Sequence, residues 1–395
     1  MRPGTPGFVG ERLQEACEAR QISPSALAEL LGISKQAVYS YVNSAATPSP
    51  EVMARISEIL RLPAVFFLER EVPQADGPVF FRSLKATTKA LRLQARQLLR
   101  WAAELSERLG EDLELPNVNF PEPFRGDFRS LTPEDIEECA SRVRAHWRMG
   151  QGPISNLVRL LETAGAVVAR VEFGADELDG LSARFGGRPV ILLASDKASA
   201  ARSRFDAAHE LGHLVLHSGV KREDAEDPTV FNELERQAHR FAGAFLFPAQ
   251  AFASECTSLS LDSFRVLKER WKVSIRMMIK RAAQLGFISE TVERRLYVNA
   301  TRRWGAGREP LDDVLPPEKP QLLAEAIRLL VEDRGLEATM AGQRLVITDV
   351  ATLAGVSVEQ LAGKEAPIVK FQPPQTQEHS TLRTGDPAPV IPLHR

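Results

Sequence analysis

The spacing of apolar residues in the first 68 positions predicts short helices separated by tight turns. Ser23 or Ser25 suits the start of the second helix and Ser34 the start of the third, because a serine oxygen can cap a first helical turn. Gly32 suits the left-handed turn between them. The apolar set that joins these helices is Ala28, Leu31, Ile33, Val38 and Tyr41. We therefore expect residues 8–68 to form a small all-α domain.

A long basic helix is predicted next, over residues 80–112. Its basic side chains are Arg82, Lys85, Lys89, Arg92, Arg96 and Arg100. Leucines recur every seven residues, at Leu91, Leu98 and Leu105, which favours packing on another helix. The charge run suits a solvated face, a strut in a dimer or extra phosphate contacts.

From residue 132 onward, the spacing of apolar residues alternates between the period of a helix and that of a strand. Residues 132–163 have a helical pattern that starts near Thr132. Residues 164–173 and 188–195 are rich in strand-forming residues, and 179–188 joins them with a turn at Gly186 and Gly187. Further helices are predicted at 196–217, 231–247, 261–271 and 274–285. We expect a mainly α fold with a small antiparallel sheet, of the α+β class, over residues 132–300.

The last part of the chain is predicted to form a small helical module over residues 318–363. Residues 349–363 have a faint helix-turn-helix spacing but lack basic residues where a recognition helix would start. This favours packing or partner binding over DNA binding. Residues 367–395 are rich in proline, threonine and glutamine, and we expect them to be disordered.

Composition narrows the class of protein. A chain of 395 residues has room for two or three domains, and its net charge of −2 gives no general affinity for nucleic acid. The N-terminus lacks a signal-peptide pattern, and no apolar run is long enough to span a membrane. Cys17, Cys139 and Cys256 form no CxxC pair. These features predict a cytoplasmic protein.

The stretch FDAAHELGHLVLH carries the clearest candidate chemistry. His209 and His213 are four residues apart, so they share one face of a helix and can bind one metal ion. Glu210 lies beside them, where it can take a proton from metal-bound water. His217 is a third histidine in the series, but it lies about 12 Å along the helix from His209. We therefore expect it outside the metal's ligand set.

A third ligand is expected on the next helix, NELERQAHRFAGAFLFP. Glu235 is the favoured candidate, and the small Ala238 would let the two helices approach. Glu233 is its competitor, facing in a different direction. His239 is either a partner that supports a ligand or a surface polar group, and His217 is a further candidate for such support.

These two helices resemble the ImmA/IrrE family of metallopeptidases, over about residues 150–290. The resemblance implies a gluzincin-like fold, with His209, His213 and Glu235 as Zn²⁺ ligands and Glu210 as general acid and base. Family members often have asparagine where this chain has His239. The resemblance also implies peptide hydrolysis, with the strand at 181–184 pairing with an extended substrate.

The stretch ALAELLGISKQAVYSYVNS resembles the Cro/C1-type (XRE) helix-turn-helix class, over residues 8–68. The exposed positions of its third helix are expected to meet double-stranded DNA. Gln36 is the best candidate to read a base, with Ser34 and Tyr39 beside it. Lys35, Ser40 and Asn43 suit phosphate or sugar. Residues 1–70 hold seven basic and seven acidic residues, so non-specific affinity should be modest.

Together the two resemblances predict a DNA-binding regulator with a zinc peptidase domain. Its expected partners are operator DNA and a repressor-like protein, or the chain itself, as substrate. A homodimer is expected because paired half-sites require two copies. Two alternatives remain: a regulator whose metal domain is a sensor or interaction module, and an antitoxin-like regulator.

Overall fold

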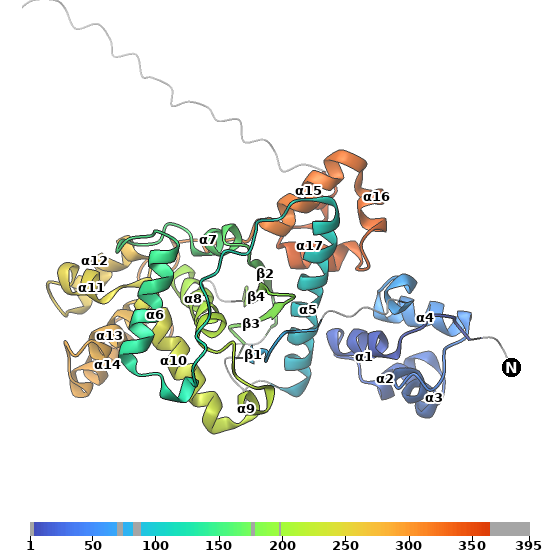
Figure 1. Cartoon of the computed structure of the whole chain (residues 1–395), viewed down its shortest axis with the longest axis horizontal. Helices are drawn as coiled ribbons and strands as arrows, with labels where there is room; N and C mark the ends of the chain where they lie inside the picture. The colour runs from blue at the N-terminus through green and yellow to red at the C-terminus, as the bar shows by residue number, and fades with distance from the viewer. Residues whose placement is uncertain (1–3, 69–73, 82–87, 175–177, 197–198, 364–395) are drawn as a thin grey trace, which may run out of the picture.

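The computed structural model describes residues 4–68, 74–81, 88–174, 178–196 and 199–363. A small sheet lies near the middle, with the N-terminal helices at one end and helices α11–α14 at the other (Figure 1). Within these described ranges, no helix has both the length and the apolarity that a bilayer crossing requires. The predicted tail at 367–395, and Arg82 and Lys85 of the predicted basic helix, lie outside them.

The N-terminal domain is all helical, as predicted. Its helices are α1 (Gly10–Ala19), α2 (Pro24–Leu31), α3 (Lys35–Val42) and α4 (Pro50–Leu60), followed by the 3-10 turn η1 (Ala64–Leu68). Ser23, and not Ser25, caps α2, and Ser34 caps α3. Gly32 ends α2 in the left-handed conformation, with φ of 66°. Gly32 and the cap at Ser34 thus produce the sharp turn between α2 and α3.

The sheet is mixed, which corrects the expected antiparallel sheet. Its strands are β1 (Phe80–Phe81), β2 (Val167–Val171), β3 (Gly180–Phe185) and β4 (Arg188–Ala194), in the order β1-β3-β4-β2. β4 is antiparallel to β3 and parallel to β2. It takes a central place because it is the most continuously buried strand. β2 and β3 therefore lie on opposite sides of β4.

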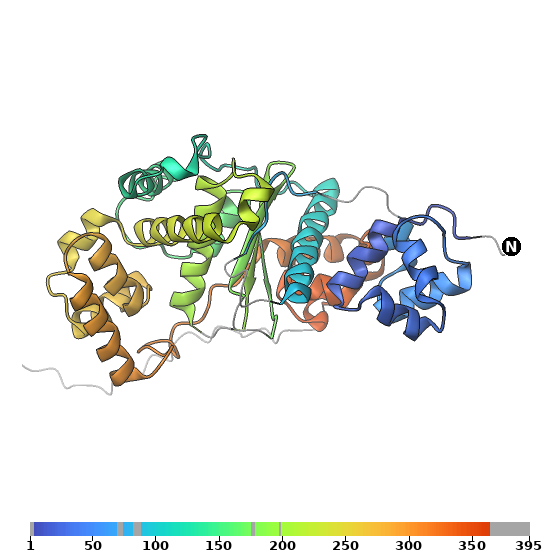
Figure 2. The same cartoon turned by 90° about the horizontal axis from the view of Figure 1, so that it is seen from below.

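Alternate residues of the sheet contribute to two separate cores. Val190 and Leu192 of β4 face the core that contains α5 (Lys89–Asp112). Ile191 and Leu193 face the core that contains α8 (Ala200–Leu216). The helices α15 (Leu322–Arg334) and α17 (Ile347–Ala354) pack on the α5 side, against β2. Figure 2 shows α5, in teal, and α8 on opposite sides of the sheet.

Helix α5 begins at Lys89, which corrects the predicted start near residue 80. Thr88 caps the helix by accepting a hydrogen bond from the Leu91 N–H. Phe80 and Phe81 instead extend the sheet, because aromatic residues favour strands and the edge of β3 offers them backbone partners. The prediction missed a strand because two residues are too few to show a period.

The leucine repeat of α5 packs inside this chain. Leu91, Leu98 and Leu105 are all buried, in a core shared with the N-terminal helices, one face of the sheet and the C-terminal helices. These contacts are intrachain. The C-terminal module therefore has a packing role here, which includes residues of α17 and α18 (Val358–Leu361).

One buried and one half-buried ion pair join the N-terminal domain to the rest of the chain. Arg12 of α1 donates to the two carboxylate oxygens of Glu104 of α5 at 2.9 and 3.1 Å, and it contacts Glu15 at 3.2 Å. Arg20 donates to both oxygens of Asp349 of α17, at 2.8 and 2.6 Å. A buried charge left without its partner is costly. These pairs therefore favour one fixed placement of the domain.

The remaining helices surround α8 and its neighbour α10 (Pro228–Leu246), against which α6 (Pro133–His146) packs. They are α7 (Leu157–Thr163), α9 (Arg222–Glu226), α11 (Ala249–Glu255), α12 (Leu261–Trp271), α13 (Ile275–Gln284) and α14 (Glu290–Trp304). The short helix α16 (Leu336–Ala341) instead packs on α15, in the C-terminal part of the chain. The predicted helix at 132–163 is thus two helices, α6 and α7.

Helices α8 and α10 approach each other unusually closely. A Cβ atom on Gly212 would lie 3.3 Å from the Ala238 Cα and 3.1 Å from the Phe241 ring. A larger residue at either small position would push the helices apart, because packed interiors have little room to yield. The contact places the middle of α8 directly against the middle of α10.

Candidate metal centre

Three potential ligand atoms converge between α8 and α10. His209 and His213 lie on successive turns of α8, and both are buried. Their Nε2 atoms are 3.0 Å apart. Glu235 of α10 lies against both, with its Oε1 3.1 Å from His213 Nε2 and its Oε2 3.3 Å from His209 Nε2. The Gly212–Ala238 contact described above is what brings these two helices together.

The spacing of these atoms fits a metal ion. A zinc ion with bonds of about 2.1 Å in tetrahedral geometry has ligand atoms about 3.4 Å apart. The three separations in this cluster, 3.0, 3.1 and 3.3 Å, are close to that edge length. Two imidazoles and one carboxylate are also a donor set found at catalytic zinc sites. The residues present therefore fit the group.

Burial controls the protonation of this cluster. It lowers the pKa of His209 to about 3, because a charged imidazolium is poorly solvated there. Burial would raise the pKa of Glu235, but the two histidines beside it lower that pKa below the ordinary range of a glutamate. At neutral pH the cluster therefore offers a neutral His209 and an ionised Glu235, the forms that bind metal ions.

His239 offers a second possible ligand set. Its ring, His209 and Glu235 have potential ligand atoms within 4.8 Å of one another. His239 Nδ1 is 2.9 Å from the Glu235 carbonyl oxygen, one turn back on α10. Because that carbonyl can only accept, Nδ1 holds a proton, and in the neutral tautomer of the ring Nε2 is the nitrogen that can bind a metal ion. We favour His213 as the third ligand because its separations match a metal site more closely.

Glu210 lies beside the cluster, held by the sheet. Ser182 of β3 donates from Oγ to Glu210 Oε2 at 2.6 Å. A Cβ atom on Gly180 would lie 3.2 Å from Glu210 Oε1, so this glycine leaves space for the carboxylate. Both Glu210 and Ser182 are buried. Sequence reasoning placed Ser182 in the strand expected to pair with substrate, but it assigned no contact with Glu210 to Ser182 or Gly180.

A buried chain of hydrogen bonds supports His213. His213 Nδ1 is 2.9 Å from His217 Nδ1, and His217 Nε2 is 2.9 Å from Gln237 Oε1. Gln237 Nε2 donates to the Phe128 carbonyl and to Glu233 Oε1, both at 2.8 Å. If His213 Nε2 binds a metal, its Nδ1 holds a proton, and every donor along this chain then meets an acceptor.

Glu233, the competing candidate for third ligand, therefore does not lie beside His209 and His213. Its carboxylate lies at the far end of this hydrogen-bond chain and is paired with Arg236 at 2.5 Å. His217 stands as the C-cap of α8, buried between Phe80 and Phe128. Gln237 was missed in the sequence, where a glutamine on a helix carries no signal of a support role.

A cavity of about 550 Å³ adjoins the cluster on the side of His239. Its border includes four basic side chains, Arg202, Arg236, Arg276 and Lys280, together with apolar surface. This cavity is large enough to take side chains of a bound peptide.

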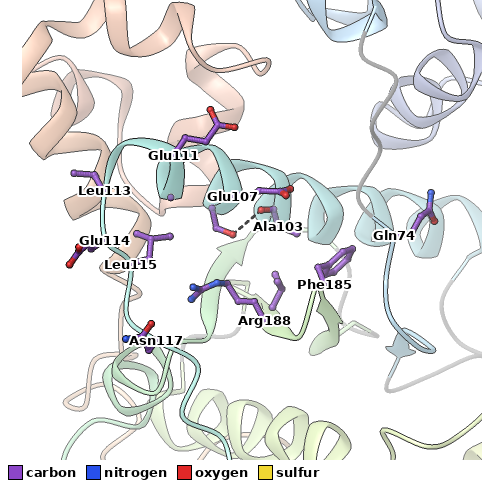
Figure 3. Close-up of a pocket in the computed structure, with 14 residues that line it drawn as sticks. Gln74, Ala103, Glu107, Glu111, Leu113, Glu114, Leu115, Asn117, Phe185 and Arg188 are labelled. Carbon is purple, nitrogen blue, oxygen red and sulfur yellow. Dashed lines mark hydrogen bonds between the residues drawn. The ribbon is translucent and has the colours of Figure 1, made fainter.

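A larger cavity, of about 790 Å³, lies away from the cluster, between α5 and the sheet. Figure 3 shows Glu107 and Glu111 of α5 on one side of it and Arg188 of β4 on the other. It opens on the α5 face of the sheet, whereas the histidines lie on the α8 face. It therefore takes no part in the candidate metal centre.

The predicted DNA-contacting residues lie together at α3. Lys35, Gln36, Tyr39 and Asn43 are exposed. The Ser34 side chain accepts the N-cap hydrogen bond of α3. Ser40 is half-buried and donates to the Gln36 carbonyl at 2.9 Å. The hydroxyl groups of Ser34 and Ser40 are thus already engaged within α3. The exposed Lys35 and Tyr39 have surface partners outside α3, Glu29 and Ser25, each at 3.4 Å.

Comparison with known proteins identifies two regions. The IrrE N-terminal-like domain, a peptidase family, matches residues 161–283, and a helix-turn-helix family matches residues 13–67. A protein of Methanocaldococcus jannaschii that is named as an HTH-type transcriptional regulatory protein is 39% identical over 70 residues. That match covers 18% of this chain and 22% of the relative, so the chain spans about a fifth of the relative's length.

The hydrogen bonds that connect His213 to His217 and Gln237 predict the effect of one substitution. His217→Phe keeps an aromatic ring between Phe80 and Phe128 but removes the acceptor for His213 Nδ1. Zinc affinity should fall about 10- to 100-fold, the usual loss when such a partner is removed. Competition with a chelator measures it. His146→Phe, at an exposed histidine, is the control. Equal affinity in His217→Phe and the parent would contradict this role.

Proposed function

The chain joins a helix-turn-helix domain to an IrrE-like domain, and from this premise we propose that it is a transcriptional regulator with a zinc-dependent peptidase activity. The observation that carries the proposal is the convergence of His209, His213 and Glu235, with Glu210 between the histidines. The proposed substrate is a repressor-like protein or the chain itself, and its hydrolysis would change gene expression.

The proposed reaction assigns a role to each group of the site. Zinc, when bound by His209, His213 and Glu235, supplies Lewis acidity that polarises a peptide carbonyl and acidifies a water molecule. Glu210 takes the proton of the attacking water at its carboxylate and later gives a proton to the leaving amine. Ser182 holds Glu210 in place through the 2.6 Å hydrogen bond to Oε2.

The DNA-binding part of the proposal depends on α3. Gln36 would read a base edge, with Lys35 on phosphate, and the exposed Tyr39 and Asn43 beside them. Two copies of the chain would bind the two half-sites of an operator in double-stranded DNA. The ion pairs of Arg12 and Arg20 would transmit the position of this domain to α5 and α17.

A second candidate function is a regulator whose metal domain binds a partner without cutting it. The observation that favours it is the position of Phe80, whose ring stacks on His213 with centroids 4.6 Å apart. The cluster is thus partly covered by the chain's own residues.

The role proposed for Glu210 is tested by Glu210→Gln. This change keeps the size of the side chain and removes its basicity, so zinc should still bind at one ion per chain. Formation of zinc-dependent fragments, from the chain or from an added repressor, should fall by about 100-fold or more. Intact-mass spectrometry measures the fragments. Ser258→Ala, at an exposed serine, serves as a control. Undiminished cleavage would show that another group is the base.

The role proposed for α3 is tested on DNA sequences selected from a random pool. Gln36→Ala should relax the preference at one base pair, at a cost of about 1–3 kcal/mol in binding. Lys35→Ala should instead weaken binding to all sequences alike and reduce the slope of its salt dependence by about one. Fluorescence anisotropy at several salt concentrations measures both. An unchanged base preference in Gln36→Ala would rule out this residue as the reader.

A further inference from the structure

A segment of the chain runs along the outer edge of β3. Phe80 and Phe81 pair antiparallel with Ser182 and Leu181. Further back, the Asp76 N–H donates to the Arg184 carbonyl at 2.8 Å. The segment Asp76–Phe81 thus lies along β3, with strand pairing at Phe80 and Phe81 and one further backbone hydrogen bond at Asp76.

Asp76 anchors the start of this segment to the β3–β4 turn. Its carboxylate accepts hydrogen bonds from the Gly186 N–H at 3.1 Å and from the Gly187 N–H at 2.7 Å. Hydrogen bonds to an ionised acceptor are stronger than those between neutral groups. Asp76 itself is exposed whereas Phe80 is buried, so the anchor is at the surface and the aromatic ring of Phe80 lies in the interior.

Phe80 carries the segment into the candidate metal centre. It is the direct cross-strand neighbour of Ser182, so the two side chains share a face of the sheet. Ser182 donates to Glu210 on that face. The Phe80 ring is buried and stacks on the His213 ring, with centroids 4.6 Å apart and planes 7° apart. An aromatic side chain therefore lies directly beside the groups proposed to perform hydrolysis.

This arrangement is the one an extended peptide adopts when it adds a strand to a sheet edge. Main-chain pairing supplies affinity, and pockets for alternate side chains supply specificity. In this chain the edge of β3 supplies the pairing, and the wall formed by His213 and His217 supplies a place for an aromatic ring. The edge that a substrate would need is thus occupied by the chain's own residues.

We infer that the edge of β3 is a binding site for an extended peptide with an aromatic residue beside His213, and that Asp76–Phe81 fills this site as a tethered ligand. The inference rests on the proposed peptidase function and names the substrate class of that site. A peptide from another protein must displace the segment, because a tethered ligand competes at a high effective concentration. The segment lies in the chain between the N-terminal domain and α5. Its binding to β3, or its release from β3, therefore affects the connection between the N-terminal domain and the IrrE-like domain.

The experiment measures binding without cleavage, in the zinc-loaded full chain carrying Glu210→Gln. The probe is a fluorescein-labelled peptide with the sequence of residues 74–81, QADGPVFF. Adding Asp76→Ala removes the surface anchor and leaves Phe80 packing untouched. The probe should then bind at least about tenfold more tightly, since tenfold corresponds to about 1.4 kcal/mol, the order of one hydrogen bond to a charged group. Asp333→Ala, on the exposed face of α15, should leave the affinity unchanged.

Two further arms test the aromatic position. A probe with both phenylalanines changed to alanine should fail to bind either protein. Phe80→Ala in the protein should also tighten binding of the original probe, with circular dichroism confirming that the variant is folded. Equal probe affinity with and without Asp76→Ala, or affinity that is insensitive to the phenylalanines, overturns the inference.

The same variants separate this inference from the peptidase proposal. With Glu210 restored, kcat/KM for a trans peptide should rise in Asp76→Ala by a factor similar to the gain in affinity. Probe binding that responds to Asp76→Ala without any hydrolysis would overturn the peptidase proposal and support the tethered ligand. Hydrolysis that Asp76→Ala does not accelerate would overturn the tethered ligand alone.

Discussion

The close approach of α8 and α10 is the constraint on which the candidate metal centre depends. Gly212 and Ala238 leave no side chain between the two helices, with a hypothetical Cβ on Gly212 only 3.3 Å from the Ala238 Cα. Glu235 lies three residues before Ala238, and His209 and His213 flank Gly212 on the sequence. Because the two helix backbones are in contact, the ligand atoms of His209, His213 and Glu235 lie within 3.3 Å of one another. The site is built from two rigid helices, which suits a preorganised metal centre.

The sheet connects this centre to the N-terminal domain. Its α8 face supplies Ser182 to Glu210, and its other face packs on α5, which holds the N-terminal domain through Glu104. The segment that leads from that domain back to α5 passes along β3, where Phe80 reaches His213. The helix-turn-helix domain and the candidate metal centre thus share a scaffold of a few packed elements. A change at the β3 edge has a physical route to the helix-turn-helix domain.

Much of this arrangement was predictable from local patterns in the sequence. Residues four apart on a helix share a face, so the spacing of His209 and His213 already predicts a pair of ligands. Helix caps and a left-handed Gly32 likewise follow from short-range chemistry. The order of the strands did not follow, because neighbours in sequence need not pair, and β4 separates β2 from β3. The contact of Phe80 with His213 and that of Ser182 with Glu210 were missed for the same reason, because they form only when distant segments pair.

X-ray absorption spectroscopy at the zinc edge tests the central claim most directly, in the purified full chain. The account predicts one zinc ion per chain with nitrogen and oxygen ligands only, at about 2.0–2.1 Å, including two imidazoles. Changing Glu235 to alanine should remove one oxygen ligand and release the metal. A chain that binds no zinc, or a zinc ion with a sulfur ligand from any of the three cysteines, would contradict the account.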